Sequence, residues 1–220
     1  MINTHYTTLF QNEDEVRRLT RRILEEGCVS LPDFLDRETF DRLLHYSQSL
    51  EDKDRRASSS ITWHEGTPAM NLARSEEFMC VFDAIHRARC EFEGQSYGPL
   101  QPARQCISLQ KNTAAVRSES TWFHFDDSYV NAVLVFRMPT NSREGNLLIY
   151  RKLRSIKPRV LSKIVARLLR HMSFLRIIFR PQEINYQEGG LHIFFGDLSF
   201  HCVPRTSHGE RLTLTVNASR

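Results

Sequence analysis

Residues 211–217 read Arg-Leu-Thr-Leu-Thr-Val-Asn and alternate between polar and apolar side chains. Because successive side chains of a β-strand point to opposite faces, this alternation predicts a strand with one buried face. Leu212, Leu214 and Val216 would pack against the core, while Arg211 and the two threonines would line the opposite face. An arginine fork binds a carboxylate through two hydrogen bonds, and neighbouring hydroxyls can add more. The stretch therefore predicts either a site for a small anion or an outer strand face in contact with water.

The rest of the second half has a similar β texture. Short runs rich in Val, Ile, Leu, Phe and Thr are separated by turns, several of which contain glycine; this is typical of a barrel or a two-sheet jelly roll. Strands are predicted at residues 106–109, 130–138, 146–150, 191–195, 200–203 and 212–216.

The first half is predicted to be mainly helical. Gly27 is a plausible helix end and Asp36 a plausible helix N-cap. Helices are expected at 13–26, 37–50 and 76–91, a short strand at 28–32, and a long polar surface loop at 51–75. The sequence thus predicts an α+β fold in which helical residues 1–103 support a β core at 104–220.

Composition excludes several classes of protein. The 220 residues carry 30 Lys and Arg against 26 Asp and Glu, and no apolar run is long enough to span a membrane. The start of the chain lacks the regions of a secretory signal, and the five cysteines form no paired-spacing motif. These features predict reduced thiols in a cytoplasmic protein and exclude membrane, fibrous and disulfide-scaffold classes.

One segment is strongly basic. Residues 151–180 contain ten Lys or Arg and no acid. Within them, residues 158–172 have apolar side chains at helical spacing, which predicts a basic amphipathic helix in an insertion at about 151–183. This helix could bind an acidic partner, lie on an anionic membrane surface, or be a solvated face that covers the barrel. Aromatic side chains are not evidently interleaved with the basic ones, which is evidence against nucleic-acid binding.

A candidate metal site begins at Trp122-Phe123-His124-Phe125-Asp126. On a strand, a His and a carboxylate two residues apart face the same side. His201, in a predicted strand, is the candidate third ligand. Two His and one carboxylate form the ligand set of non-haem Fe(II) oxygenases, which leaves positions open for a co-substrate and oxygen. Taken alone, the spacing also fits a local hydrogen bond at the end of a surface strand.

Three stretches taken together resemble the core of the Fe(II)/2-oxoglutarate-dependent dioxygenases. They are Trp122-Phe123-His124-Phe125-Asp126-Asp127, Gly196-Asp197-Leu198-Ser199-Phe200-His201 and Gly209-Glu210-Arg211-Leu212-Thr213-Leu214. Residues 27–35 also resemble the opening strand-and-helix unit of phytanoyl-CoA-hydroxylase-like and prolyl-hydroxylase-like members. The resemblance implies a double-stranded β-helix, a cupin-like jelly roll, in a single domain over residues 1–220.

The resemblance also implies roles for individual residues. Arg211 would hold the distal carboxylate of 2-oxoglutarate, with Thr213 as an accessory hydroxyl and Lys111 as a further co-substrate contact. The implied cofactors are Fe(II), 2-oxoglutarate and O₂, with ascorbate as the reductant in vitro, and the implied reaction is hydroxylation or another oxidation of a C–H bond. The implied iron ligands are His124, Asp126 and His201.

The substrate expected from these features is a small polar or amino-acid-derived metabolite. Trp63 and His64 would belong to a lid over the substrate, or else they anchor their loop by burying the indole. Asp127 would contact the substrate or orient a ligand, or else it belongs to a plain turn. The alternatives are a hydroxylase or demethylase of a protein side chain or nucleic acid, and a non-catalytic cupin-like module that binds an anion.

Overall fold

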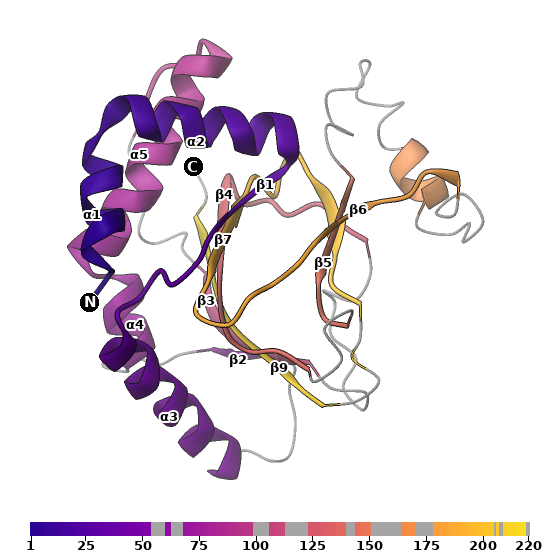
Figure 1. Cartoon of the computed structure of the whole chain (residues 1–220). Helices are drawn as coiled ribbons and strands as arrows, with labels where there is room; N and C mark the ends of the chain where they lie inside the picture. Colours follow the sequence, from indigo (N-terminus) through magenta and orange to yellow (C-terminus); the bar gives the residue numbers. More distant parts are fainter. Residues whose placement is uncertain are drawn as a thin grey trace.

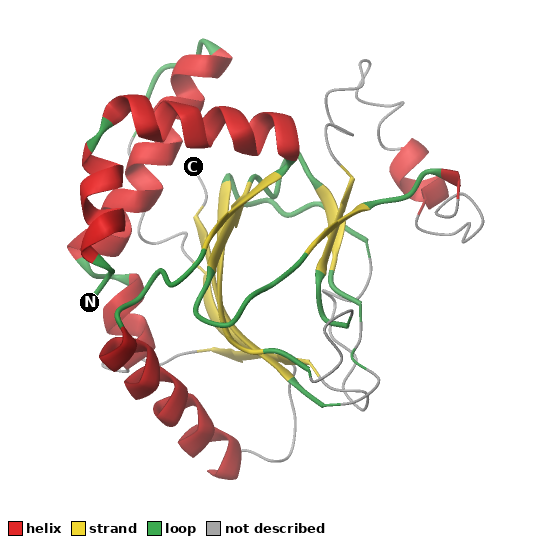
Figure 2. Ribbon diagram, in the orientation of Figure 1, coloured by secondary structure: helices red, strands yellow, loops and turns green. Residues whose placement is uncertain are grey.

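The computed structural model of the chain contains two antiparallel β-sheets that face each other, with helices on the outer face of the larger sheet (Figures 1 and 2). The structure describes residues 1–53, 60–62, 68–98, 106–112, 123–139, 144–150, 164–169, 178–204, 206 and 209–218.

The larger sheet has the strand order β1-β7-β4-β9-β3-β2. Its strands are β1 (Cys28–Leu31), β2 (Ser60–Thr62), β3 (Cys106–Asn112), β4 (Val130–Arg137), β7 (Leu191–Phe194) and β9 (Arg211–Ala218). Strand β9 lies near the middle of the sheet, and Leu214 stands opposite Leu109 on one side and Leu134 on the other. The last strand of the sheet in chain order is therefore held by two neighbours that are distant from it in sequence.

The smaller sheet has the order β6-β5-β8. It consists of β5 (Leu147–Tyr150), β6 (Gln182–Ile184) and β8 (Phe200–Cys202). At β8, His124 and His201 form an antiparallel bridge with reciprocal backbone hydrogen bonds of 2.9 Å each. The segment that carries His124 is therefore attached to the edge of this sheet.

Helices of the N-terminal half cover the larger sheet on one side (Figure 1). The side chain of Asn12 caps the second helix by accepting hydrogen bonds from the backbone N–H groups of Asp14 and Glu15. This helix ends at Gly27, whose φ of 87° lies in the left-handed region that glycine tolerates best. The helices are α1 (Thr4–Gln11), α2 (Glu13–Glu26), α3 (Arg37–Lys53), α4 (Pro68–Ala73) and α5 (Glu76–Glu93).

The main core lies between these helices and the larger sheet. On β9, Leu212, Leu214 and Val216 are buried against helical residues such as Ile23 and Phe82. A second apolar cluster fills the space between the two sheets and consists of Cys28, Val133, Val135, Leu147, Ile149, Tyr186, Phe194 and Val203. The two faces of the larger sheet therefore serve two different cores.

The predicted order of helices followed by strands is confirmed. The predicted strands and the helices at 13–26, 37–50 and 76–91 all form, with ends that differ by a few residues. Asp36 caps α3 by accepting a 2.8 Å hydrogen bond from the backbone N–H of Thr39. The alternation in 211–217 places the predicted leucines in the core.

Two predicted segments were wrong in part. The loop predicted at 51–75 contains the end of α3, strand β2 and helix α4, in which Ala69, Met70 and Ala73 are buried. Its polar composition concealed this short apolar face. The insertion predicted at 151–183 ends earlier than expected, because Gln182–Ile184 forms strand β6 of the smaller sheet.

Only part of the predicted basic helix falls within the described residues, at 164–169, and that part is helical. Ala166 and Leu169 are buried in an apolar cluster with Tyr150 of β5, whereas Ile164 and Leu168 remain 49% and 42% exposed. The predicted apolar stripe is therefore not buried as a whole, because the helix contacts the small sheet through one narrow face.

The predicted cytoplasmic location depends on the absence of membrane-spanning helices and of disulfide bonds. Among the described residues, no helix is both long and apolar enough to cross a membrane. Within the part of the chain that the structure describes, Cys28, Cys80, Cys90 and Cys202 form no disulfide bond. The prediction of a cytoplasmic protein stays a prediction.

A buried histidine makes the fold sensitive to acid. His192 of β7 is fully buried between the sheets; it forms a 2.9 Å hydrogen bond with Ser30 Oγ, and its Nε2 accepts from the backbone N–H of Gln187. Burial lowers the pKa of His192 from 6.5 to about 4. The unfolded chain takes up a proton at this position below about pH 6.5, and the folded chain does so only near pH 4, so stability falls as the pH is lowered through this window.

We therefore predict that the free energy of unfolding contributed by His192 falls by about 2 kcal/mol between roughly pH 7.5 and pH 5. Urea unfolding at both pH values, for the wild type and for His192→Gln, measures this contribution as the difference between the two proteins. The exposed His5→Gln serves as the control. A difference that does not change with pH would contradict the prediction.

Candidate metal and anion site

Three of the predicted site residues meet at one point between the sheets. His124 comes from the segment beside β8, Asp126 follows two residues later, and His201 lies on β8 itself. His124 Nε2 is 3.2 Å from Asp126 Oδ1, and His201 Nε2 is 3.4 Å from Asp126 Oδ2. One ligand atom from each residue lies within 4.8 Å of the other two, so this group could hold a metal ion.

Backbone contacts hold the ligand atoms in this arrangement. The carbonyl of Ser199 accepts a 3.0 Å hydrogen bond from Nδ1 of His201. A carbonyl oxygen only accepts, so Nδ1 of His201 carries a proton, and Nε2 is the ring nitrogen on the side of Asp126. The backbone N–H of Asp126 donates to the Gly196 carbonyl at 3.2 Å. Nε2 of His201 is thus the ring nitrogen that could bind a metal ion.

The carboxylate of Asp126 is ionised in this environment. Burial alone would raise its pKa, but hydrogen bonds and charge from His124 and His201 hold the pKa of Asp126 well below its usual range. Asn131 donates a further hydrogen bond from Nδ2 to Asp126 Oδ2. Two imidazoles and one carboxylate on one side of an open site are the donor set that suits Fe(II).

A cavity of about 80 Å³ adjoins the three residues. Its lining combines side chains from both sheets: His124, Asp126, Asn131, Val133, Leu147, Tyr186, Phe194, His201, Val203, Arg211, Thr213, Thr215 and Asn217. The polar face predicted for the last strand therefore faces this cavity, as the alternation in the sequence indicated.

Arg211 is a buried cation on the wall of this cavity. It is 1% exposed and donates one hydrogen bond of 3.3 Å, from Nη1 to the Gly145 carbonyl, while its Nε has no partner. Within the described part of the chain, no carboxylate forms an ion pair with Arg211. The adjacent Glu210 forms its ion pair with Arg137. Burial lowers the pKa of Arg211 to about 10, so the guanidinium is still charged at neutral pH.

Two more polar atoms of residues that line this cavity lack hydrogen-bond partners among the described residues. They are Thr213 Oγ1 and Asn217 Oδ1, both buried on the same face of β9. A buried donor without a partner costs free energy, and a buried charge costs more. Arg211 and Thr213 therefore form a site that a small anion would complete.

The other predicted site residues are Asp127, Lys111, Trp63 and His64. Asp127 is exposed and does not line the cavity. The register places Lys111 opposite Leu212, whose side chain packs toward the helices, and Gln110 opposite Thr213. The co-substrate contact of Lys111 stays a prediction. Trp63 and His64 lie outside the described residues.

Several residues around the site were missed in the sequence. Apart from Arg137 at the end of β4, Asn131 is the only polar residue of this strand, and that isolated polarity was a usable signal. Thr215 was predicted on the same face as Arg211 and Thr213, but Asn217, which continues their alternation, was not. Tyr186 follows β6 and lines the cavity, but nothing in its sequence context marks it.

Comparisons with known proteins identify the fold. The chain matches no family profile and no curated protein in sequence. In structure it is similar to a prolyl 4-hydroxylase of Phytophthora capsici, with a TM-score of 0.59 and 15% identity, over 94% of this chain and 63% of that one. The chain therefore spans less than two thirds of that enzyme.

Two further structures extend the likeness. HygX of Streptomyces hygroscopicus, solved with nickel and 2-oxoglutarate bound, has a TM-score of 0.56 and 11% identity over 88% of this chain and 82% of that one. SnoN, a non-haem α-ketoglutarate-dependent epimerase of nogalamycin biosynthesis, has a TM-score of 0.57 and 11% identity over 94% and 84%. At these identities the likeness shows a shared fold, which is that of the 2-oxoglutarate/Fe(II) oxygenases.

Gly196 provides a test of the site geometry. A Cβ atom at this position would lie 2.7 Å from Asp126 Cβ and 2.7 Å from Asn131 Nδ2, closer than real Cβ contacts allow. We predict that Gly196→Ala displaces Asp126 and weakens Co(II) binding by about 10-fold or more, measured by titration of the purified protein. Gly98→Ala is the control, because a Cβ there meets no atom within 4 Å. Unchanged Co(II) affinity in Gly196→Ala would show that Asp126 does not hold the metal.

Proposed function

We propose that this protein is a non-haem Fe(II)- and 2-oxoglutarate-dependent oxygenase, built as a single domain over residues 1–220. The observation that carries the proposal is that a His124–Asp126–His201 group and an Arg211 without a carboxylate partner adjoin the same cavity. Either feature alone would also fit a protein that binds only a metal or only an anion. Together they match an enzyme that holds a metal and an anionic co-substrate side by side.

We further propose that the two sheets form a double-stranded β-helix. In support, the chain passes from β4 in the larger sheet to β5 and β6 in the smaller one, returns at β7, crosses again at β8 and ends at β9 in the larger sheet. The pairings between these strands are antiparallel in both sheets. This alternation of strands between two facing sheets is what a jelly-roll core requires.

The residues present fit the proposed groups. The Nε2 atoms of His124 and His201 and the ionised Asp126 would hold Fe(II), and Arg211 with Thr213 would bind the distal carboxylate of 2-oxoglutarate. When bound, iron and 2-oxoglutarate supply the oxidising chemistry: O₂ is consumed, 2-oxoglutarate becomes succinate and CO₂, and a C–H bond of the substrate is hydroxylated. Apolar side chains such as Val133, Phe194 and Val203 exclude water from the cavity wall.

We propose a small polar or amino-acid-derived metabolite as the substrate, with the protein in the cytoplasm. Four described cysteines that form no disulfide bond are consistent with that location. The likeness to a prolyl 4-hydroxylase supports a second candidate, the hydroxylation of a protein side chain. A non-catalytic anion-binding module is the third; it would need Arg211 but not a group of three metal-binding side chains.

The assay that tests the proposal is succinate formation from 2-oxoglutarate by purified protein with Fe(II), ascorbate and O₂, with and without a metabolite extract. We predict extract-stimulated succinate in the wild type and none in His124→Ala, whose fold is retained because His124 is only partly buried. The exposed His5→Ala should behave as the wild type. Undiminished succinate in His124→Ala would contradict the metal assignment.

A second prediction concerns Arg211. Replacement by Met removes a buried charge that lacks a carboxylate partner, so the apo protein should keep or increase its melting temperature. The same change should abolish the increase in melting temperature that 2-oxoglutarate causes in the Mn(II)-loaded wild type. Thermal unfolding with and without 2-oxoglutarate measures both effects, with the exposed Arg17→Met as the control. Equal stabilisation of Arg211→Met by 2-oxoglutarate would show that the co-substrate binds elsewhere.

A further inference from the structure

A second buried arginine lies on the other side of the larger sheet, in helix α5. Arg89 is 1% exposed, and its guanidinium donates two hydrogen bonds of 2.8 Å to the two carboxylate oxygens of Asp197. It also donates from Nε to Glu93 at 2.7 Å and from Nη1 to the backbone carbonyl of Tyr129 at 2.7 Å. The guanidinium carbon lies 3.6 Å from the ring centroid of Tyr129. The fork is thus held in one orientation from several directions.

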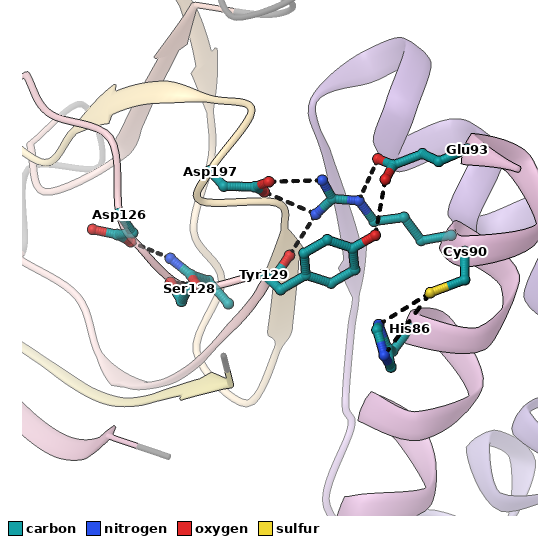
Figure 3. A network of polar contacts seen from close by, with 9 residues as sticks. His86, Cys90, Glu93, Asp126, Ser128, Tyr129 and Asp197 are labelled. Carbon is teal, nitrogen blue, oxygen red and sulfur yellow. Dashed lines mark hydrogen bonds and ion pairs between the residues drawn. The ribbon is translucent and has the colours of Figure 1, made fainter. Parts of the chain in front are cut away.

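The contacts of Arg89 belong to the two turns that carry the candidate metal ligands. Asp197 lies in the turn between β7 and β8, and its backbone N–H donates to the Ser128 carbonyl at 3.1 Å. Tyr129 lies in the turn that follows Asp126. Figure 3 shows Asp197 and Tyr129 between Glu93 of the helix and Asp126 of the site. One side chain of the helical layer therefore joins both turns to each other.

From each turn a short chain of contacts reaches a metal ligand. In the first turn, the backbone N–H of Ser199 donates to the Phe195 carbonyl, and the Ser199 carbonyl accepts from Nδ1 of His201. In the second turn, the Ser128 hydroxyl donates to Asn131 Oδ1, and Asn131 Nδ2 donates to Asp126. Displacement of either turn would therefore change the position of a ligand atom.

Helix α5 is already held against the sheet by apolar side chains, so Arg89 is not needed for that attachment. Phe78, Val81, Phe82 and Ile85 of α5 already pack in the main core. A buried ion pair is seldom more stabilising than apolar packing of the same volume, whereas a bidentate pair fixes the direction of both groups. What Arg89 adds to the apolar packing is a defined orientation of the Asp197 carboxylate.

We infer that Arg89 is a positioning residue for the metal site, acting through Asp197 and Tyr129 on Asp126 and His201. The inference rests on the proposed role of these two residues as metal ligands. The helical layer thereby contributes to the site although none of its described residues belongs to the metal-binding group.

The test uses Co(II) alone as the probe, titrated into the full-length protein, with the Co(II) absorption spectrum as a second readout. Arg89→Lys keeps the charge but cannot make the four hydrogen bonds of the fork, so we expect Co(II) to bind about 10- to 100-fold more weakly, with an altered spectrum. Arg87→Lys is the matched control, because Arg87 lies on the same helix in an exposed pair with Asp83. Ile23→Val, in the core of α2, controls for a general loss of stability.

A merely structural role would make Arg89→Lys resemble Ile23→Val, with a lower melting temperature but wild-type Co(II) affinity and spectrum, and that result would overturn the inference. If Arg89→Lys does not fold, Asp197→Asn, which removes the charge of the partner, takes its place. No uptake of Co(II) by the wild type would instead reject the metal site, and the inference would fail with it.

A double-mutant cycle tests whether Arg89 acts on Asp126 through Asn131. Asn131→Ala removes the hydrogen bond to Asp126 directly. If Arg89 acts partly through this contact, the loss of Co(II) affinity in the double variant should be smaller than the product of the two single losses. Losses that multiply would show that Arg89 does not act through Asn131, and the inferred path to Asp126 would then be wrong.

Discussion

The constraint on which the arrangement depends is the cost of burying a charge. Arg89 and Arg211 are both buried to 1% exposure, and the fold treats them in opposite ways. Burial would lower the pKa of Arg89, but hydrogen bonds and charges from Asp197 and Glu93 outweigh it and the pKa is raised. The pKa of Arg211 is lowered, because no carboxylate among the described residues offsets the burial. The charge of Arg89 is thus neutralised by carboxylates of the protein itself. The buried charge of Arg211 is not, and a bound anion would neutralise it.

Strand β9 carries both Arg211 and leucines of the main core. Its leucines complete the core beneath the helices, and its alternate residues, beginning with Arg211 and Thr213, form a wall of the cavity. A slip of one residue would exchange the two sets of side chains, burying polar groups in the core and placing leucines at the site. The pairing of β9 with β3 and β4 on both sides prevents such a slip. Core packing and site chemistry therefore depend on the same register.

Local patterns predicted much of this, and long-range contacts account for what they missed. The alternation in 211–217 predicted a polar strand face, and the spacing of His124 and Asp126 marked a candidate metal group; both patterns depend on neighbouring residues. The role of Lys111 stays a prediction, because its face is set by pairing with a strand about a hundred residues away and no local pattern shows that pairing. The contact between Arg89 and Asp197 spans 108 residues and has no local signature. The buried face of α4 was hidden by a polar neighbourhood.

The smaller sheet gives a reason why the site needs support from a distance. It has three strands, of which β6 and β8 are three residues long, and His201 lies on one of these short edges. Short strands of this kind hold a side chain less firmly than the eight-residue β4 and β9 of the larger sheet. A metal site tolerates displacements of only a few tenths of an ångström in its ligand atoms. The precision therefore has to come from the turns on either side, and these turns are fastened to the larger sheet and, through the buried guanidinium of Arg89, to helix α5.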